Sequence, residues 1–390
     1  MRDGWIETTL DGIADVIMGQ SPDGKSYNQE GKGLPFMQGS AEFGEHNPIP
    51  EKWCSDPKKI AEPGDLLLSV RAPVGDTNFA DQRIAVGRGL SIIRANKESL
   101  TEFIRLVIQL NVAELIASSG SGMFASITGK NLKEFKVNLP PLPEQKRIVD
   151  LISSVDSYIE ALQQQLESAE KSRNAVLYEL LTAGGDDWIE TSLGDIAEVV
   201  GGGTPSTTIG EYWDGDIVWL TPTEITSQDG KVVSDSIRKI TDLGFKNSGA
   251  QMLPKDSVIL TSRASVGFVA LAGKELCTNQ GFQSLIPKPS VLSKFLMFWI
   301  QQNRPEFESR SAGSTFKEIS KSNVKSIKLQ LPPLPDQRRI VEIVNTIDEV
   351  ISQTELTTSK AQNLRSGLLS DLLSGEHEIP PSYDKVMGAA

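Results

Sequence analysis

Hydrophobic residues recur at two different spacings along the chain, and each spacing predicts a different kind of element. Short apolar runs such as DLLLSV (residues 65–70) and LSIIRA (90–95) are rich in branched side chains and bounded by glycine or proline, which predicts buried strands. Residues 99–118 and 290–300 instead place their apolar side chains on one stripe at helical spacing. The globular regions of the chain are therefore predicted to mix α and β structure.

Two other stretches carry a longer and stricter pattern. They follow the heptapeptides LPPLPEQ (139–145) and LPPLPDQ (331–337), and their apolar residues recur at alternating steps of four and three, the heptad repeat of a coiled coil. The seam positions are Ile148, Ile152, Val155, Ile159, Leu162, Leu166, Ala169, Arg173, Val176 and Leu180, and in the second copy Ile340, Val344, Ile347, Ile351, Thr354, Thr358, Ala361, Arg365, Leu368 and Leu372. Each helix is expected to span about 39 residues, or ~60 Å, before a glycine ends it.

Ordinary core packing is the alternative explanation of these stripes. Ten seam positions in register, present twice, favour the coiled coil, because globular helices seldom sustain such a repeat. Arg173 and Arg365 interrupt the two seams at the same layer. We expect each arginine to extend its charged end to water or to pair with an acidic residue.

The whole chain is duplicated, and not only the heptapeptide. WIETTLDGIADV from Trp5 recurs as WIETSLGDIAEV from Trp188, an offset of 183, and from Gly75 and Gly267 onward the offset is 192. The nine additional residues of the second copy fall mostly within 202–254. A period this long indicates a duplicated domain with its helix rather than a solenoid.

The order of these regions along the chain predicts the topology. The first globular region leads into the first helix, the helix leads into the second globular region, and that region leads into the second helix, so helices that pack together must be antiparallel. The two ends of the chain are then expected to lie close together, in a near-circular molecule with pseudo-twofold symmetry. Its two globular regions, which we call heads, would lie at opposite ends of a rod formed by the two helices. The predicted fold is α+β, and its predicted regions are residues 1–138 (first head), 139–184 (first helix), 185–330 (second head), 331–376 (second helix) and 377–390 (tail).

Charge and composition restrict the function. The net charge of −12 argues against nucleic acid. The globular regions are nearly balanced, however, because residues 1–140 hold 15 basic and 18 acidic groups and residues 186–330 hold 15 and 17, so a local basic face is possible. No apolar run is long enough to span a membrane, and the N-terminus carries no secretory signal.

Cysteine and histidine usage points away from metal and thiol chemistry. Cys54 and Cys277 form neither a disulfide pattern nor a metal cluster, which fits a reducing cytoplasm. With His46 and His377 as the two histidines, neither a histidine-centred catalytic site nor a zinc site is expected.

Two kinds of catalytic motif are missing from the sequence. An N6-adenine methyltransferase needs an [N/D]-P-P-[Y/F/W] loop to hold the flipped base, but Asn47 and Pro48 are followed by Ile49. No G-x-x-x-x-G-K-[S/T] phosphate loop is present, and GGGTP (201–205), which lacks the lysine, is interpreted as a turn at a strand end. Two similar heads without such chemistry suit a pseudo-twofold ligand, and double-stranded DNA offers half-sites ~34 Å apart.

With these motifs in view, the sequence resembles the specificity subunits of type I restriction–modification systems. The resemblance covers nearly the whole chain and rests on the heptapeptides with the following KRIVDLISSVDSYI and RRIVEIVNTIDEVI, on the pair that begins at Trp5 and Trp188, and on SVRAPVG and TSRASVG. It implies two target-recognition domains, each reading one half of a split DNA sequence, and an antiparallel coiled coil of the two helices. It also implies that this chain has no enzyme activity of its own.

The resemblance further implies the partners. Two adenine methyltransferase subunits would use S-adenosylmethionine, and translocating restriction subunits would use ATP and Mg, so this chain is expected to hold no cofactor or metal. Two other functions remain compatible with the sequence. One is a stand-alone DNA-binding or architectural protein, and the other is a coiled-coil scaffold for other proteins, which the acidic surface favours.

Comparison of the two copies divides the candidate DNA-contact residues into those that both heads share and those that differ between them. Features that both heads share are expected to serve the scaffold or to contact phosphates. For Arg71 and Arg263, an internal salt bridge is an equal alternative. The shared candidates are Ser21 and Thr204, Arg71 and Arg263, Gly89 and Gly281, and the loop regions 121–126 and 314–318 with Ser121, Ser314 and Lys317. Lys130 is a further candidate.

Polar stretches that differ between the heads are the better candidates for reading bases. They are residues 23–33, 38–47, 206–216, 221–228 and 231–246, and they supply side chains that hydrogen-bond base edges or stack on a flipped base. A solvated loop is the alternative for each one. The candidates are Lys25, Tyr27, Asn28, Lys32, Gln38, Thr207, Tyr212, Thr221, Thr223 and Lys231, with Arg88 and Gln280, which differ at matched positions beside a shared glycine.

Overall fold

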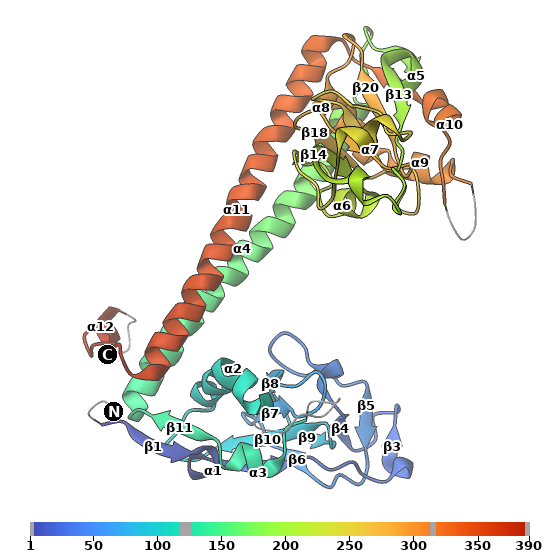
Figure 1. Cartoon of the computed structure of the whole chain (residues 1–390). Helices are drawn as coiled ribbons and strands as arrows, with labels where there is room; N and C mark the ends of the chain where they lie inside the picture. The colour runs from blue at the N-terminus through green and yellow to red at the C-terminus, as the bar shows by residue number, and fades with distance from the viewer. Residues whose placement is uncertain (1–3, 118–125, 313–316, 387–390) are drawn as a thin grey trace. The chain divides into compact units, whose positions relative to one another are not determined.

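A computed structural model describes residues 4–117, 126–312 and 317–386 (Figure 1). The chain forms two compact units, which we call unit 1 (Met1–Gln163 with Leu356–Ala390) and unit 2 (Gln164–Glu355). Each unit contains one globular head and half of each long helix, α4 (Leu142–Thr182) and α11 (Leu334–Ser374). The boundaries between heads and helices expected from the sequence stay a prediction.

Head 1, the globular region of unit 1, is built on two small sheets. One is antiparallel with the order β2-β10-β7-β8, and the other has the order β3-β5-β4-β9-β6, in which β4 and β9 run parallel. The strands are β2 (Ala14–Met18), β3 (Tyr27–Asn28), β4 (Leu34–Met37), β5 (Lys52–Cys54), β6 (Ile60–Ala61), β7 (Leu66–Ser69), β8 (Thr77–Phe79), β9 (Ile84–Val86) and β10 (Leu90–Ala95). The predicted strands at 65–70 and 90–95 are therefore confirmed.

Helices and a strand pair complete head 1. The predicted helix at 99–118 is confirmed as α2 (Thr101–Ala117), whose apolar side chains share one core with β7 and β10. β1 (Ile6–Thr9) pairs with β11 (Lys136–Leu139), the strand that leads into α4. The short helices are α1 (Leu10–Ile13), α3 (Gly129–Lys133) and the 3-10 turns η1 (Gly24–Ser26) and η2 (Ser40–Glu42).

Head 2, the globular region of unit 2, repeats this plan with additions. Its sheets have the orders β13-β20-β17-β18-β15 and β16-β14-β19, and β12 pairs with β21 as β1 does with β11. The strands are β12 (Ile189–Ser192), β13 (Ala197–Gly201), β14 (Trp213–Leu220), β15 (Val232–Val233), β16 (Lys239–Ile240), β17 (Val258–Leu260), β18 (Val269–Ala272), β19 (Cys277–Thr278), β20 (Gln283–Pro287) and β21 (Lys328–Leu331). The helices are α5 (Leu193–Ile196), η3 (Gly210–Tyr212), α6 (Pro222–Thr226), α7 (Asp242–Lys246), α8 (Ser293–Gln302), α9 (Arg304–Ser309) and α10 (Lys321–Ser326).

The glutamine of the duplicated heptapeptide fixes the start of each long helix to its head. Buried Gln145 accepts from the Leu100 N–H (2.9 Å) and donates to the carbonyls of Glu98 and Pro140 (both 2.8 Å). Gln337 makes the same three hydrogen bonds in unit 2, at 2.8, 3.1 and 2.8 Å. Because these bonds satisfy backbone groups at the point where strand becomes helix, both copies require the glutamine.

Each long helix ends at a glycine with a left-handed backbone, as predicted: Gly184 has φ +67° and Gly375 has φ +77°. After Gly375 comes a tail with the short helix α12 (Tyr383–Val386). A Cβ on Gly375 would lie 3.6 Å from the Trp5 ring, so the end of α11 meets the start of head 1. The predicted proximity of the chain ends is therefore confirmed for Trp5 and Gly375.

The two long helices pair in antiparallel fashion within each unit. In unit 1 the seam residues Ile159, Leu162 and Ala361 pack together, so early residues of α4 meet late residues of α11. Every predicted seam position is buried or half-buried. Arg365 pairs with Asp156 (Nη2–Oδ2 3.0 Å), so of the two outcomes expected for this arginine the structure shows the pairing with an acidic residue.

Unit 2 repeats this ion pair at the matching seam position. Arg173 pairs with Asp348 and lies over the ring of Phe298 of α8 (5.4 Å to the centroid), so the arginine links both helices to the head.

No helix in the described ranges is long and apolar enough to cross a membrane.

Candidate nucleic-acid interface

In head 1, loops from several strands meet at one edge of the sheets. On the turn from β9 to β10, the N–H groups of Gly87 and Gly89 donate to the carbonyls of Met37 and Gln38 (2.8 and 3.1 Å). The Gly89 carbonyl in turn accepts from Val70 (2.9 Å). Glycine is needed at residue 89, because a Cβ there would lie 2.3 Å from the Gln38 carbonyl oxygen. The ends of β4, β7 and β9 are thus held together by backbone contacts.

Several predicted DNA-contact residues lie on this edge. The Ser21 hydroxyl donates to Gln38 Oε1 (3.2 Å) and accepts from the Arg88 N–H (3.4 Å). The Arg88 side chain is exposed, and so is Arg71, which follows Val70. We call the surface formed by Ser21, Gln38, Arg71 and Arg88 the loop edge of head 1.

Head 2 builds the same edge from different side chains. The Asn279 N–H donates to the Leu220 carbonyl (3.0 Å), and the Gly281 carbonyl accepts from Ser262 (2.7 Å). The Thr204 hydroxyl donates to Gln280 Oε1. The loop edge of head 2 is formed by Thr204, Thr221, Arg263 and Gln280.

Strand register shows which residues of the two edges correspond. In head 1 the residue before Gln38 faces Val86, and in head 2 the residue before Thr221 faces Thr278. Residues 86 and 278 are 192 apart, the offset of the repeat, so Gln38 and Thr221 occupy the same place. Their own offset is 221 − 38 = 183, which places the additional residues of head 2 after Thr221.

The paired arginines have different neighbours. Arg263 Nε lies 2.9 Å from Glu318 Oε1, and the two residues are also β-bridge partners. The β-bridge partner of Arg71 is Ser126, and Arg71 forms no ion pair with any described residue. The internal salt bridge is therefore found for Arg263, while Arg71 presents its charge to solvent.

In the stretch of residues 23–33, the candidate side chains of Tyr27, Asn28 and Lys32 already contact other residues of head 1. The Tyr27 ring stacks on Phe36 (centroids 4.7 Å apart). Asn28 Oδ1 accepts from the N–H groups of Glu30 and Lys32 (3.1 and 2.9 Å), which closes the turn, and the Lys32 ammonium lies 2.6 Å from the Glu30 carboxylate. A role of these residues in DNA contact stays a prediction.

In head 2 a cavity of about 520 Å³ opens beside Thr221. The buried Glu224 carboxylate accepts from the Thr221 hydroxyl (2.6 Å) and from the Ile237 N–H (2.8 Å) and thereby shapes the wall. Asp235 also lines the cavity, and its pKa is lowered by a hydrogen bond from the Lys239 ammonium. Thr223 is exposed at the same cavity. Thr221 and Thr223, both predicted from the sequence, are thus brought together.

The comparisons with known proteins bear on these two heads directly. The family of type I restriction modification DNA specificity domains matches residues 2–171 and again residues 185–364. The chain belongs to this family. The resemblance inferred from the duplicated motifs is therefore confirmed, and each head with part of its helix is one specificity domain.

Named relatives agree with this assignment, and a solved structure shares the fold. The MjaIX type I restriction enzyme specificity subunit of Methanocaldococcus jannaschii is 38% identical over 167 residues, which are 42% of this chain and 39% of that relative. The EcoBI type I restriction enzyme specificity subunit of Escherichia coli is 21% identical over 431 residues, which cover 96% of this chain and 87% of the relative. A chain from a structure of the type I R-M system matches the fold with a TM-score of 0.68 at 18% identity, over 96% of this chain and 98% of that one.

The remaining candidates are spread over the two specificity domains. Lys130 lies in α3 with its ammonium 3.9 Å from Glu134, and Lys317 is exposed next to Glu318. Ser121 and Ser314 lie outside the described residues. Lys25, Thr207 and Lys231 are exposed, while Tyr212 is half-buried against the cluster of Trp213 and Trp219.

Two residues of the second specificity domain were not singled out from the sequence. Ile237 is 88% exposed at the mouth of the cavity, and Arg238 lies over the Trp213 ring (3.6 Å to the centroid). Both belong to the divergent stretch 231–246, which was the available signal in the sequence.

Cys277 is buried in head 2. Burial raises the pKa of its thiol to about 12, so this cysteine stays protonated and is no nucleophile at neutral pH.

Proposed function

We propose that this chain is the DNA specificity subunit of a type I restriction–modification complex and that each head reads one half of a split double-stranded target. The loop edge carries the proposal. Two of its backbone hydrogen bonds recur at matching positions in both heads, whereas Gln38 and Arg88 of head 1 are replaced by Thr221 and Gln280 in head 2. A shared frame with altered polar side chains suits two readers of different bases, since arginine prefers guanine and glutamine prefers adenine in the major groove.

The catalytic chemistry in this proposal belongs to partner subunits. Two adenine methyltransferase subunits with S-adenosylmethionine, and restriction subunits with ATP and Mg, would join the chain in the cytoplasm. The missing methyltransferase and phosphate-loop motifs support a non-catalytic role for this chain. The length of the paired helices, 41 residues each, would set the spacer between the two halves of the target.

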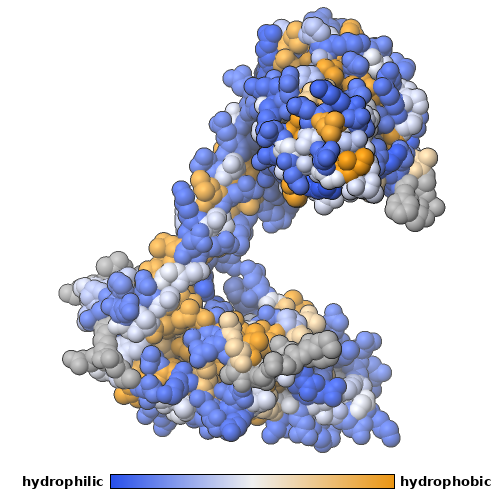
Figure 2. Space-filling view, viewed as in Figure 1, coloured by the Kyte–Doolittle hydropathy of each residue, from blue (hydrophilic) through white to orange (hydrophobic). Residues whose placement is uncertain are grey.

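The paired helices also offer a docking surface for such partners. In unit 1 a groove of about 360 Å³ is lined by Val155, Tyr158, Ala361 and Leu364, among others. Tyr158 and Leu364 are 53% and 57% exposed, and Figure 2 shows hydrophobic residues scattered among hydrophilic ones on the helices. Exposed apolar side chains that line one groove together, as these do, are typical of protein interfaces, unlike apolar residues scattered singly.

The decisive test is a methylome. The gene is expressed together with its methyltransferase partner in a host that lacks adenine methylation, and modified bases are mapped with and without this chain. We expect methylation of one split sequence that appears with the chain and disappears without it. Methylation that is unchanged when the chain is omitted would contradict the proposal. Methyl transfer from S-adenosylmethionine by the highly purified chain alone would contradict the non-catalytic role.

A further inference from the structure

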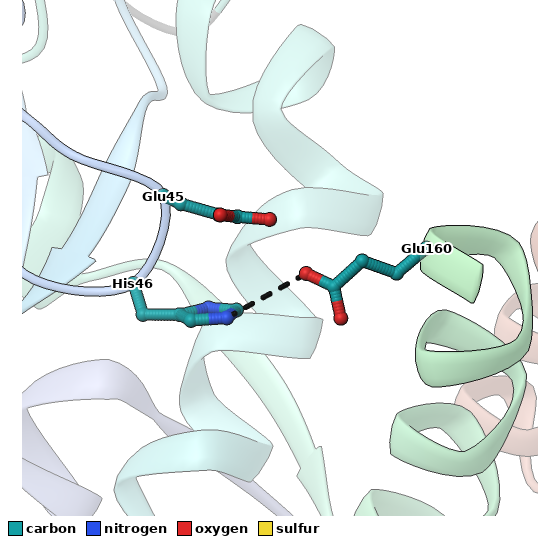
Figure 3. A group of neighbouring side chains, drawn as sticks. All are labelled: Glu45, His46 and Glu160. Atoms are coloured by element: carbon teal, nitrogen blue, oxygen red, sulfur yellow. Dashed lines mark ion pairs between the residues drawn. The ribbon is translucent and has the colours of Figure 1, made fainter. Parts of the chain in front are cut away.

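Unit 1 holds a further group of side chains, apart from the loop edge of head 1 formed by Ser21, Gln38, Arg71 and Arg88. Glu45 and His46 lie in the loop after η2 and point toward Glu160 on α4 (Figure 3). One ligand atom of each residue lies within 4.8 Å of the other two, and His46 Nε2 lies 3.6 Å from Glu160 Oε1. A hydrogen bond between the Glu45 and Glu160 side chains raises the pKa of the Glu160 carboxyl.

The loop that carries two of these residues is fixed by its own backbone contacts. The Phe79 N–H donates to the His46 carbonyl (3.2 Å), and the Asn47 amide donates back to the Phe79 carbonyl (3.0 Å). The Asn78 amide donates to the Gly44 carbonyl (2.9 Å). The loop is thus tied to β8 on both sides of Glu45 and His46, so the backbone that carries these two ligands is fixed.

The third residue stands on an equally fixed element. Glu160 lies one turn after Asp156 on α4, and Asp156 is held by Arg365 of α11. The adjacent seam residue, Ile159, is buried between the helices, which fixes the side of α4 from which Glu160 projects. All three side chains also line a cavity of about 370 Å³ that leaves room for an ion and water.

We propose that Glu45, His46 and Glu160 form a binding site for one divalent transition-metal ion, such as Zn²⁺. Zinc accepts one imidazole nitrogen and two carboxylate oxygens together with a water molecule. Tetrahedral ligands at 2.0–2.1 Å from zinc are about 3.3 Å apart, close to the 3.6 Å between His46 Nε2 and Glu160 Oε1. Small side-chain rotations therefore suffice to bring the three ligands into place.

No motif in the sequence indicates this site, since His46 and Glu160 are 160 − 46 = 114 residues apart. At the position that matches Glu160, residue 160 + 192 = 352, unit 2 has a serine. The site is thus specific to unit 1, and one ion per chain is expected. A bound ion would cross-link the loop of head 1 to α4.

The test is isothermal titration of the full-length, untagged chain, freed of metal with a chelator, with ZnCl₂. We expect one saturable site per chain and a rise in the unfolding temperature of the zinc-loaded protein. His46→Ala and, independently, Glu160→Gln are expected to weaken zinc binding by about 100-fold, because each removes one of three protein ligands. With Co²⁺ in place of zinc, the visible absorption of a four-coordinate ion should appear in the parent chain and not in these variants.

Two matched variants separate this site from adventitious binding. Glu167→Gln removes an exposed carboxylate from the same helix, and His377→Ala removes the other histidine, and both should bind zinc as the parent chain does. Absence of saturable zinc binding in the parent chain would overturn the proposal. Equal zinc affinity of His46→Ala and the parent would overturn it as well, because the ion would then sit elsewhere.

Discussion

Arg71 and Arg263 occupy the same place in the two heads, and the structure gives them different neighbours. Glu318 pairs with Arg263 at 2.9 Å, whereas the matching position in head 1 is Ser126. The residue before each arginine donates to the carbonyl of the matching glycine, Gly89 or Gly281, and accepts from the N–H of Ile127 or Ile319. We call the hydrogen bonds and packing contacts that both units share the frame. Duplication has therefore preserved the frame of the heads, while single side-chain differences on it have changed the charge that each head presents.

The helices show the same division between frame and detail. Gln145 and Gln337 make identical sets of hydrogen bonds, and both seams carry an arginine paired with an aspartate. Yet Leu162 in the seam of unit 1 corresponds to Thr354 in unit 2. We expect substitutions in the frame to act alike in both units, and substitutions at divergent positions to act on one unit.

The largest effect is expected in the seam. Ile159→Asp places a charge without a partner among Leu162 and Ala361, and we expect a loss of unfolding free energy on the order of 3 kcal/mol. The matching Ile351→Asp should cost less, because Ile351 is only half-buried. Urea unfolding followed by circular dichroism measures both, with the exposed Ser157→Asp as control. Equal losses for Ile159→Asp and Ser157→Asp would show that the seam is not buried.

The glutamines test whether the two frames are equivalent. Gln145→Ala and Gln337→Ala each leave buried backbone groups without partners, and we expect each to lower the free energy of unfolding by about 2–3 kcal/mol. The exposed Gln164→Ala serves as the control, with almost no loss. Losses that differ widely between the two variants would contradict an equivalent frame.

Much of this frame was predictable from the sequence, because its signals are periodic and occur twice. The seam follows from heptad spacing and the helix ends follow from glycine, while pairing with an acid was one of two outcomes expected for Arg173 and Arg365. The correspondence of Gln38 with Thr221 did not follow, because additional residues of head 2 break the alignment between landmarks. It became visible only through the register of β4 with β9 and of β14 with β19.

Local contacts were beyond prediction for a different reason. The sequence marks Tyr27 and Asn28 as polar or aromatic loop residues, but stacking on Phe36 and closure of the turn depend on the fold. The same holds for Glu160, which meets His46 only because α4 passes the loop of head 1.

The divergent side chains are tested by exchanging them. Replacement of residues 206–250 by the corresponding loops of a relative should change one half of the methylated sequence and leave the other half and the spacer fixed. Each lost base contact should cost about 1–3 kcal/mol of discrimination. Exchange of residues 23–47 is the matched experiment in head 1. A methylome in which both halves change together, or only the spacer changes, would contradict separate readers.

The smallest expected effect concerns the two arginines, and it addresses their difference directly. If the loop edges contact phosphates, Arg71→Ala should weaken binding of the assembled complex to all sequences alike and reduce the slope of log affinity against log salt by about one. Arg263→Ala should weaken binding less, because the paired guanidinium already shares its charge with Glu318. Fluorescence anisotropy with a specific and an unrelated duplex at several salt concentrations measures both quantities.

Exchanging the neighbours should reverse the difference. Glu318→Ser removes the acidic partner of Arg263, so DNA affinity should rise and the salt slope should steepen. Ser126→Glu should pair with Arg71 and lower affinity to about the level of Arg71→Ala, while stability changes little, because an exposed ion pair contributes only about 0–1 kcal/mol. Should Ser126→Glu and Glu318→Ser leave affinity and salt slope unchanged, the arginines do not contact DNA, and the matched positions serve the frame alone.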